Sequence, residues 1–561
     1  MAVLFCGYVL YGGWLVRQWG VGEGDIPTPA HALEDGVDYV PAKAPVLMGH
    51  HFSSIAGAGP ITGPIGAAMF GWLPVTLWIL VGGVFFGGVH DFGALFASVR
   101  HKGQSIGEVI SANMSRRAKR LFIIFSYLTL ILVVAAFAAI VASTFGAKIV
   151  NGAVDYKASA TNASVAMVSI MFILIAIVFG LAVYRRHASM VTSSILGVIG
   201  IVLCMAIGMN FHPFYFTTKT WMWIIGAYIT IASVTPVWIL LQPRDYLSSF
   251  LLYAMLIIAI IGIFGAHPDI DPKLFPAVTG FAVDNGNGVQ LLFPILFTTV
   301  ACGAISGFHS LVSSGTTSKQ LDKESDAKPI AYGGMLLECV LAIITVCAIA
   351  YARTTGHTKG ATDIFAGGIA AMVAAIPGLE GMESSFYTLL VLTYSAFCLT
   401  SLDTATRLAR FMFQEFWLEP GETVHDVKDG FRSFMVNPYF ATILTVVLGV
   451  LLGLNGFAKI WGLFGAANQL LAGIGLLAVA TWLGNAGKNN KMFLFPMTFM
   501  LIVTICSLIL TVKNQLGIIA KGAADWGPYA QAGIGTLLVL LAFVLAIEGY
   551  QTIAHPKRNA A

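Results

Sequence analysis

Charged residues are scarce in this chain of 561 residues: 10% are Asp, Glu, Lys or Arg, whereas 57% are hydrophobic. A soluble globular domain carries about 25% charged residues, so this composition excludes that class. Long polar segments are also missing, and no loop is long enough to form an independent domain. The seven cysteines all lie inside apolar runs without CxxC spacing, which gives neither a disulfide framework nor a zinc motif.

Repeated apolar runs take the place of polar segments. About 20 helical residues cross the hydrocarbon core of a bilayer, so runs of this length predict an all-α polytopic membrane protein. We predict fifteen spans, at residues 2–17, 47–70, 73–98, 121–147, 163–184, 190–209, 221–241, 247–266, 290–316, 330–354, 386–412, 439–457, 460–483, 492–512 and 530–549.

Basic residues are unevenly shared between alternate predicted loops, which hold 22 and 9 of the 31 Lys and Arg residues. Cytoplasmic loops are enriched in Lys and Arg, so this bias predicts an N-terminus outside and a C-terminus in the cytoplasm. Residues 105–120 are predicted to form a basic amphipathic helix on the inner leaflet. The short apolar stretch 364–376 is typical of a re-entrant or interfacial helix.

The stretch Gly49–Gly63 combines two adjacent histidines, three hydroxyls, four glycines and a proline inside one predicted span. Gly57 and Gly59, followed by Pro60, predict a helix that is broken at membrane depth. The backbone groups freed by such a break must be satisfied within the protein, and they can bind an ion or a carboxylate. The alternative is close helix packing through small residues.

Several stretches together carry a family resemblance, and the most specific is GHHFSSIAGAGPI at Gly49–Ile61. The others are Pro27–Ala30, Asp35–Pro41, Gly71–Pro74, His90–Phe92, Ser98–Gly103, Ser306–Ser310 and Leu402–Arg407. They resemble the carbon starvation protein A (CstA) family of bacterial inner-membrane transporters.

The resemblance implies a secondary transporter that imports short peptides or pyruvate-like carboxylates in carbon-limited cells. It implies a proton as the coupling ion in preference to sodium, with no required cofactor, no enzymatic activity and no nucleic-acid partner. It also implies a LeuT-type core of two inverted five-helix repeats within the lipid bilayer. The oligomeric state is left open.

The inverted topology predicts an N-terminal helix and linker at 1–46, repeats at 47–209 and 210–412, and C-terminal helices at 413–561. The first helix of each repeat should be broken, and Thr235-Pro236 in span 221–241 offers the second break. In a rival assignment, Gly307–Gly315 pairs with Gly49–Gly57, because the two stretches are similar. Two extra spans would then separate the repeats.

Ionisable and hydroxyl groups at membrane depth are the candidate site residues. For substrate binding we predict His50, His51, Ser53, Ser54, Gly57, Gly59, Thr230, Ser233, Thr235 and His309. For proton or cation coupling we predict His90, Asp91, Ser310, Ser313, Ser314, Glu338 and Asp403. Histidine titrates near neutral pH, which suits a proton carrier.

Each assignment has a structural alternative. The histidines can be hydrogen-bonded to neighbouring helices, and Asp91 can pair with Arg100 at the interface. Ser310, Ser313 and Ser314 can bond their own backbone instead of forming a sodium site. Glu338 is expected to pair with a histidine or Arg244, and Asp403 with Arg407 at the i, i+4 spacing of a helical salt bridge.

Other functional classes remain open at this stage. His50, His51, His90, Asp91 and His309 can alternatively converge as the metal site of a metal-binding membrane protein or enzyme. A channel is less favoured because broken inverted helices are typical of a carrier. A nutrient sensor with vestigial transport is also possible, but the sequence shows no attached signalling domain.

Overall fold

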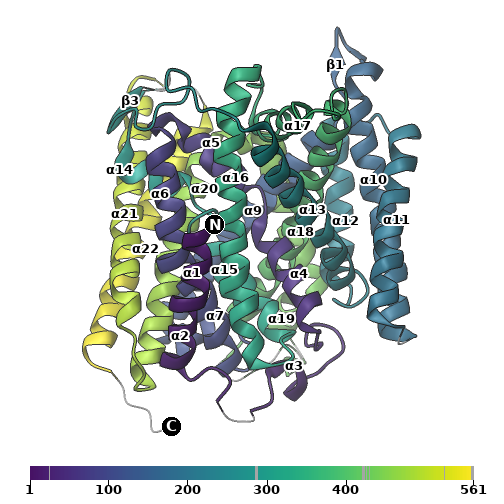
Figure 1. Cartoon of the computed structure of the whole chain (residues 1–561). Coiled ribbons are helices and arrows are strands. Elements are labelled where there is room, and N and C mark those ends of the chain that lie inside the picture. Colours follow the sequence, from purple (N-terminus) through teal and green to yellow (C-terminus); the bar gives the residue numbers. More distant parts are fainter. Residues whose placement is uncertain are drawn as a thin grey trace.

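The computed structural model describes residues 1–23, 26–186, 188–284, 288–419, 422, 424, 426–428, 430–522 and 525–556. Its helices stand side by side as one bundle, with β1 and α17 at one end and α3 and α19 at the other (Figure 1). We call these ends the β1 side and the α3 side. The strands form only two short antiparallel hairpins among the described residues, β1–β2 and β3–β4.

The part before residue 270 contains α1 to α13. Its helices are α1 (Ala2–Cys6), η1 (Gly7–Tyr11), α2 (Gly12–Trp19), α3 (Pro29–Ala32), α4 (Ala44–Ala56), α5 (Gly59–Ala67), η2 (Ala68–Phe70), α6 (Trp72–Gly82), η3 (Gly83–Gly87), α7 (Gly88–Arg100), α8 (Ile106–Asn113), α9 (Arg116–Phe145), α10 (Tyr156–Gly180), η4 (Leu181–Arg185), α11 (Met190–Asn210), α12 (Thr218–Val234) and α13 (Leu241–Ala266). Its strands are β1 (Ile149–Val150) and β2 (Ala153–Val154).

The remaining part begins with the second hairpin, β3 (Ala282–Asp284) and β4 (Val289–Leu291). Its helices are α14 (Leu292–Thr299), α15 (Gly307–Gly315), η5 (Thr317–Lys319), η6 (Glu324–Asp326), η7 (Lys328–Tyr332), α16 (Gly333–Thr355), η8 (Asp363–Gly367), α17 (Gly368–Ala374), α18 (Glu383–Phe416), α19 (Gly430–Met435), α20 (Pro438–Asn485), α21 (Lys491–Ala520) and α22 (Trp526–Ala554).

Eleven of the described helices are long and apolar enough to cross a membrane. The all-α, polytopic class is therefore confirmed, whereas the count of fifteen spans is not. The predicted spans missing from the eleven are 2–17, 47–70, 221–241 and 290–316. Three of these four are short or interrupted, because α12 has 17 residues and both α4–α5 and α14–α15 contain a break.

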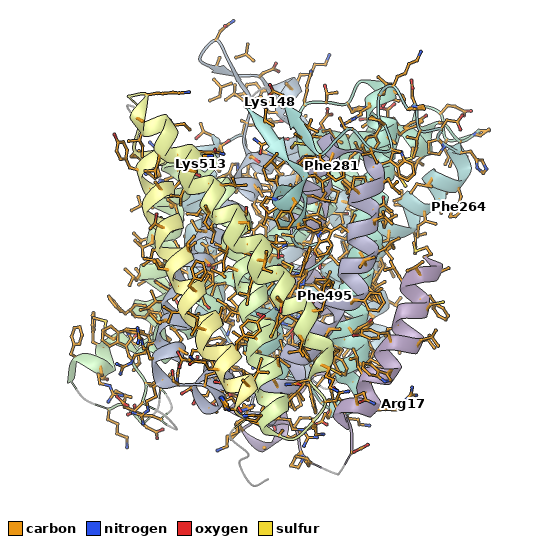
Figure 2. All side chains as sticks on the ribbon, turned by 90° about the vertical axis from the view of Figure 1, so that its left-hand side faces the viewer. Arg17, Lys148, Phe264, Phe281, Phe495 and Lys513 are labelled. Carbon is orange, nitrogen blue, oxygen red and sulfur yellow. The ribbon has the colours of Figure 1, made fainter. Side chains whose placement is uncertain are left out.

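The flank of the bundle is apolar, as a lipid-facing surface requires. Figure 2 shows Phe495 on this flank, Lys148 and Lys513 toward the β1 side, and Arg17 toward the α3 side. Phe495 is 69% exposed, and many other large apolar side chains along the outer helices are exposed as well. In water such a surface would aggregate, but in a bilayer it faces acyl chains.

The segment 105–120 does not form the predicted helix on a leaflet. It divides into α8 and the start of α9, and Ile106, Val109 and Ile110 of α8 are fully buried in the protein core. The apolar face of α8 thus packs against protein instead of lipid. The stretch 364–376 does form a short apolar helix, composed of η8 and α17.

The predicted break in Gly49–Gly63 is present. The helix α4 ends at Ala56, and Gly57 has φ +25°, a conformation that side-chain-bearing residues rarely adopt. A methyl group at Gly57 would also lie 2.9 Å from the ring of Phe137 in α9. Gly57 therefore meets two demands at once, a left-handed backbone and a close approach to α9.

A second interruption separates α14 from α15 at residues 300–306 and lies against the first. A Cβ placed on Gly59 would come within 2.4 Å of the Cβ and Sγ of Cys302. A Cβ on Gly63 would lie 2.9 Å from the carbonyl oxygen of Thr299. Small residues thus let the start of α5 cross the 300–306 interruption at backbone distance.

The elements that follow the two interruptions come in the same order. After α4–α5 come a long helix (α6–α7), a short one (α8) and another long one (α9); after α14–α15 come η7–α16, the short α17 and α18. Thr235 and Pro236 instead end α12, and α13 is a separate helix. This order favours the rival pairing of Gly49–Gly57 with Gly307–Gly315, while the repeat boundaries stay predictions.

Candidate functional site

The Arg244 cluster consists of His50, Tyr228, Arg244, Asp245 and Asp403, contributed by α4, α12, α13 and α18. The guanidinium of Arg244 donates to Asp245 Oδ1 at 2.9 Å, to Asp403 Oδ2 and to the hydroxyl of Tyr228. Tyr228 in turn donates to Asp403 at 2.7 Å, and His50 Nδ1 lies 2.7 Å from Asp245 Oδ2. One arginine therefore holds four helices together through two carboxylates.

The Glu338 cluster consists of His90, Asp91, His309 and Glu338, from α7, α15 and α16. Asp91 stands between two imidazoles, 2.7 Å from His90 Nδ1 and 2.9 Å from His309 Nδ1. The other nitrogen of His309, Nε2, lies 3.3 Å from Glu338 Oε2. All four side chains are fully buried.

Glu338 has no Lys or Arg partner within the described part of the chain, and neither of its oxygens has a hydrogen bond. Burial penalises the charged carboxylate, whereas a neighbouring imidazolium favours it. Glu338 and His309 are therefore two adjacent buried groups, each of which is able to carry a proton. The predicted pairing of Glu338 with a histidine is what the structure shows, and the alternative pairing with Arg244 is not.

Asp91 is neither solvated nor paired with Arg100. Its side chain is inaccessible to solvent, and Arg100 pairs instead with Glu324 at 2.8 Å. The interfacial alternative for Asp91 is therefore wrong, because α7 continues to Arg100 and leaves Asp91 more than two turns inside.

The remaining predicted residues of α4 face different partners. His51 Nδ1 lies 2.9 Å from the hydroxyl of Thr317, and its Nε2 is buried without a hydrogen bond. Ser53 donates to the carbonyl of Asp245 at 3.2 Å. Ser54 contacts Thr404 of α18 at 3.0 Å, and its carbonyl accepts from Ser401 at 2.8 Å. As expected for successive helical residues, His50 and His51 do not share a ligand.

Two of the three predicted serines on α15 bond within their own helix. Ser310 donates to the carbonyl of Gly307, and Ser314 donates to that of Ser310, both at 2.7 Å. Ser313 is buried without a partner. The first two hydroxyls thus bond their own helix, which is the structural alternative foreseen for them.

The hydroxyls at the end of α12 also bond locally. Thr230 donates to Gly226 and Thr235 to Ile231, both at 2.8 Å, whereas Ser233 lies 3.2 Å from Thr442 of α20. The predicted break at Thr235-Pro236 is a helix end, so these residues line neither of the two buried clusters.

Arg407 occupies the carbonyls freed at that helix end. Its guanidinium donates to Ala232 O at 2.8 Å, to Thr235 O at 2.5 Å, and to Asp38 at 2.7 Å. The predicted Asp403–Arg407 salt bridge is therefore absent, because each residue has a partner on another element. Arg410, one turn further on, also contacts Asp38, at 3.2 Å.

Asp38 lies in the linker between α3 and α4, and with Arg407 and Arg410 it forms what we call the Asp38 clasp. Burial by itself would raise the pKa of Asp38, but the two guanidinium groups outweigh that effect and lower it to about 2. The carboxylate is thus ionised at every physiological pH. The clasp fastens the linker across the α3-side end of α18.

One group of potential metal ligands occurs among the described residues. Ligand atoms of Cys302, His309 and Glu338 lie within 4.8 Å of one another, and all three residues are buried. The predicted five-residue metal set is not brought together, since His50 and His51 face other partners.

Several residues of these clusters were not predicted. Asp245, Tyr228, Asp38, Thr317 and Cys302 had no assigned role, and Arg244 was only a possible partner for Glu338. The available signal was the pair Arg244-Asp245 just before the predicted span 247–266. The helix α13 begins at Leu241, so both charges lie inside the protein.

Charged and titratable groups buried between interrupted helices, inside a bundle with an apolar flank, are the features of a membrane transporter. The comparisons agree with this class. Residues 1–356 and 348–507 match the family described as "Carbon starvation protein CstA". The chain belongs to this family.

Two relatives show how far the similarity extends. The "Peptide transporter CstA" of Bacillus subtilis (strain 168) is 34% identical over 530 residues, which cover 86% of this chain and 83% of that protein. The "Pyruvate/proton symporter BtsT" of Escherichia coli (strain K12) is 32% identical over 536 residues, covering 80% of this chain and 72% of that protein.

Solved structures with lower similarity also align. MhsT in complex with L-phenylalanine aligns over 90% of this chain and 99% of its own, with 14% identity and a TM-score of 0.49. A mutant of the manganese transporter of Eremococcus coleocola aligns over 93% and 99%, with 12% identity and a TM-score of 0.49.

Proposed function

We propose that this transporter imports small carboxylates or short peptides by proton symport, as part of the response of a bacterium to carbon starvation. The printed names of the two relatives, a peptide transporter and a pyruvate/proton symporter, support this range of substrates. Both classes carry a carboxylate. We place the chain in the inner membrane with its N-terminus outside and its C-terminus in the cytoplasm, in agreement with the distribution of basic residues.

The observation that carries the proposal is the crossing of the two interrupted helices beside two buried titratable clusters. His50 and His51 lie on α4, within two turns of its end at Ala56, and His309 is the third residue of α15. A rearrangement of α4 or α15 therefore changes the partners of groups in both clusters. Such a link between helix position and protonation is what symport requires.

The order of helices supports a LeuT-type cycle in which two repeats alternate around the crossing. We propose that α4–α5 and α14–α15 are the first helices of the two repeats, with α10 and α11 among the additional spans. Alternating access then consists of movement of the interrupted helices against α9 and α18.

The test is uptake of labelled pyruvate and of a labelled dipeptide into proteoliposomes, with proton and sodium gradients imposed separately. We expect a proton gradient to drive uptake and a sodium gradient to have a smaller effect. Uptake should drop sharply in Glu338→Gln and in His51→Ala. A wild-type protein that accumulates neither solute under a proton gradient would contradict the proposal.

A further inference from the structure

The guanidinium of Arg244 is paired on one side only. Its two terminal nitrogens donate to Tyr228, Asp403 and Asp245, whereas its Nε is buried without a hydrogen bond. Ser248, one turn further along α13, likewise has a buried hydroxyl without a partner. Leaving a buried donor unpaired is unfavourable, so these two groups on one face of α13 are available to donate hydrogen bonds to a bound solute.

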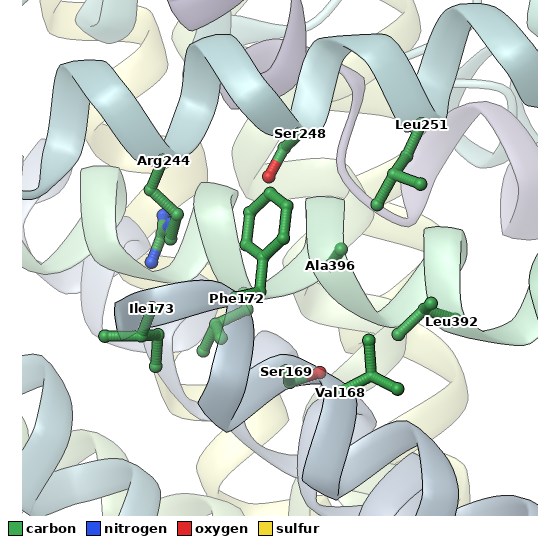
Figure 3. A pocket seen from close by; sticks show the side chains of 10 residues that line it. Val168, Ser169, Phe172, Ile173, Arg244, Ser248, Leu251, Leu392 and Ala396 are labelled. Atoms are coloured by element: carbon green, nitrogen blue, oxygen red, sulfur yellow. The ribbon is translucent and has the colours of Figure 1, made fainter. Parts of the chain in front are cut away.

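Both groups line the same cavity, between α10, α13 and α18 (Figure 3). Arg244 and Ser248 project from α13 toward Phe172 of α10. Most of the other walls are apolar, with Leu251 and Leu399 among them. The cavity is therefore an apolar space with one guanidinium edge and a hydroxyl at its wall.

A second cavity continues this space along α10 and α18. The two cavities share Val168 and Leu392, and the second extends to Thr388, five residues from the start of α18. Together they follow the α10–α18 boundary from Arg244 toward the β1 side. In this structure the first cavity, with about 10 Å³ of free space, has room for no more than one water molecule, so a solute can enter only when α10 and α18 separate.

Charge balance determines what else must happen when an anion binds there. Arg244 already faces two carboxylates, Asp245 and Asp403, so a third carboxylate would leave a buried negative charge uncompensated. Asp245 is also held by His50 at 2.7 Å, whereas Asp403 has one oxygen, Oδ1, without a hydrogen bond. Asp403 is therefore the carboxylate that can leave the arginine by accepting a proton.

We propose that Arg244 binds the carboxylate of a small monocarboxylate with a short apolar tail, such as a 2-oxo acid, in exchange for Asp403, which takes up one proton. This inference rests on the proposed function. The hydrogen bond from Arg244 to Asp403 is replaced by one to the solute, and the proton becomes the O–H of Asp403. One negative charge and one positive charge enter together, so the net charge of the cluster does not change.

The cavity walls favour a monocarboxylate over a peptide. None of the described residues that line the first cavity is acidic, so the ammonium group of a peptide would have no partner there. The hydroxyl of Ser248 can donate to a 2-oxo group, and Phe172 and Leu251 can cover a methyl group. A neutral ester of the same acid lacks the charge that Arg244 recognises.

The first test measures proton uptake during binding. Pyruvate is added to purified protein in weakly buffered detergent solution containing a pH-sensitive dye. We expect about one proton to be taken up for each bound pyruvate, and none with methyl pyruvate. In Asp403→Asn, pyruvate should still bind but without proton uptake. Proton uptake equal to that of wild type in Asp403→Asn would overturn the inference.

The second test separates this inference from the proposed function. In proteoliposomes, Asp403→Asn should retain exchange of labelled for unlabelled pyruvate. Its proton-driven accumulation of pyruvate should fall at least about tenfold. The matched control is Asp363→Asn, at a carboxylate outside the bundle core, which should behave as wild type. If wild type accumulates pyruvate and Asp403→Asn does so equally, only the inference fails. If wild type accumulates none, the proposed function fails.

A third variant keeps the inference testable if Asp403→Asn does not fold. The groups around Asp403 are Tyr228 of α12, Arg244 and Asp245 of α13 and, through Asp245, His50 of α4. Tyr228→Phe removes a donor that stabilises the ionised carboxylate, so the pH of half-maximal uptake should rise. An unchanged pH profile in Tyr228→Phe would contradict the role of Asp403.

Discussion

The carboxylates of the Arg244 cluster and of the Glu338 cluster are all buried, but only those of the Arg244 cluster face an arginine, in addition to His50 beside Asp245. Asp245 and Asp403 face a guanidinium, which remains charged at any physiological pH. Asp91 and Glu338 face imidazoles, which are neutral or charged according to whether they hold an extra proton. A carboxylate beside a permanent cation can be replaced by another anion when it takes up a proton, whereas a carboxylate beside histidines can pass a proton to them without an anion entering.

This difference separates two kinds of coupling that the same transporter can use. If only Asp403 takes up a proton, each monocarboxylate enters with one compensating charge and uptake is electrically neutral. If the Glu338 cluster binds a second proton in the same cycle, each turnover carries one net positive charge and responds to membrane voltage. Four variants test how sharply the two clusters differ.

The largest expected effect is on stability, and only in the Arg244 cluster. Arg244→Gln leaves Asp245 and Asp403 buried without their cation, which should destabilise the protein by about 4 kcal/mol. Glu338→Gln leaves no Lys or Arg unpaired in the described structure and should change stability far less. Thermal unfolding of both variants in detergent, followed by Tm, compares them directly. Equal losses would remove the distinction between the clusters.

Glu338 should matter for transport even though its substitution hardly changes stability. In Glu338→Gln we expect proton-driven uptake to fall about 100-fold, because a positioned proton-transfer group contributes at least that much. Glu380→Gln provides a matched control, since Glu380 is exposed in the loop before α18. Initial rates in proteoliposomes at several pH values measure the effect. A Glu338→Gln protein with the pH profile of wild type would show that the Glu338 cluster is only structural.

The Asp38 clasp, at the end of α18, also pairs a carboxylate with arginines, and its loss should likewise reduce stability. Asp38→Asn leaves Arg407 and Arg410 without their carboxylate and should cost about 2 kcal/mol. Because the pKa of Asp38 is lowered to about 2 from 3.8, its contribution is complete above about pH 4 and is lost as the pH falls toward 2. The Tm difference between wild type and Asp38→Asn should therefore be the same at pH 5 and pH 8. A difference that shrinks between these values would contradict the assignment.

The smallest effect is expected outside both clusters. Thr230→Ala removes a hydroxyl that bonds only the preceding turn of α12, so uptake of pyruvate should stay within about twofold of wild type. Kinetic measurement of KM and of the maximal rate decides this. A large rise in KM would show that Thr230 contributes to substrate binding, and would contradict a binding site at Arg244.

The fold could be predicted largely from the sequence because hydrophobicity and glycine act locally. Apolar runs gave the spans, and Gly57 with Gly59 and Pro60 gave the break after Ala56. The spacing of two inverted five-helix repeats predicts the second break in span 221–241, where Thr235-Pro236 offers a local signal for it. At residues 300–306 the interruption depends on a crossing with α5, and such contact between distant segments leaves no local pattern.

The candidate site could be predicted in part. His50, His51, His90, Asp91, His309 and Glu338 were singled out because polar groups are costly within a bilayer, and all are buried in the structure. Their division into two clusters depends on which helices pack together, which one sequence does not reveal. Asp245 was missed because charges lower the hydropathy of a window, so the predicted span began two residues after it.

The contact between Gly59 and Cys302 has a mechanical consequence. The two interrupted segments touch closely here and at Gly63, so a tilt of one segment would have to slide it over the other. Both segments would have to move about this contact, and a methyl group at position 59 would block the movement by clashing with Cys302. Substitutions there should arrest the whole cycle even though neither residue needs to touch the solute.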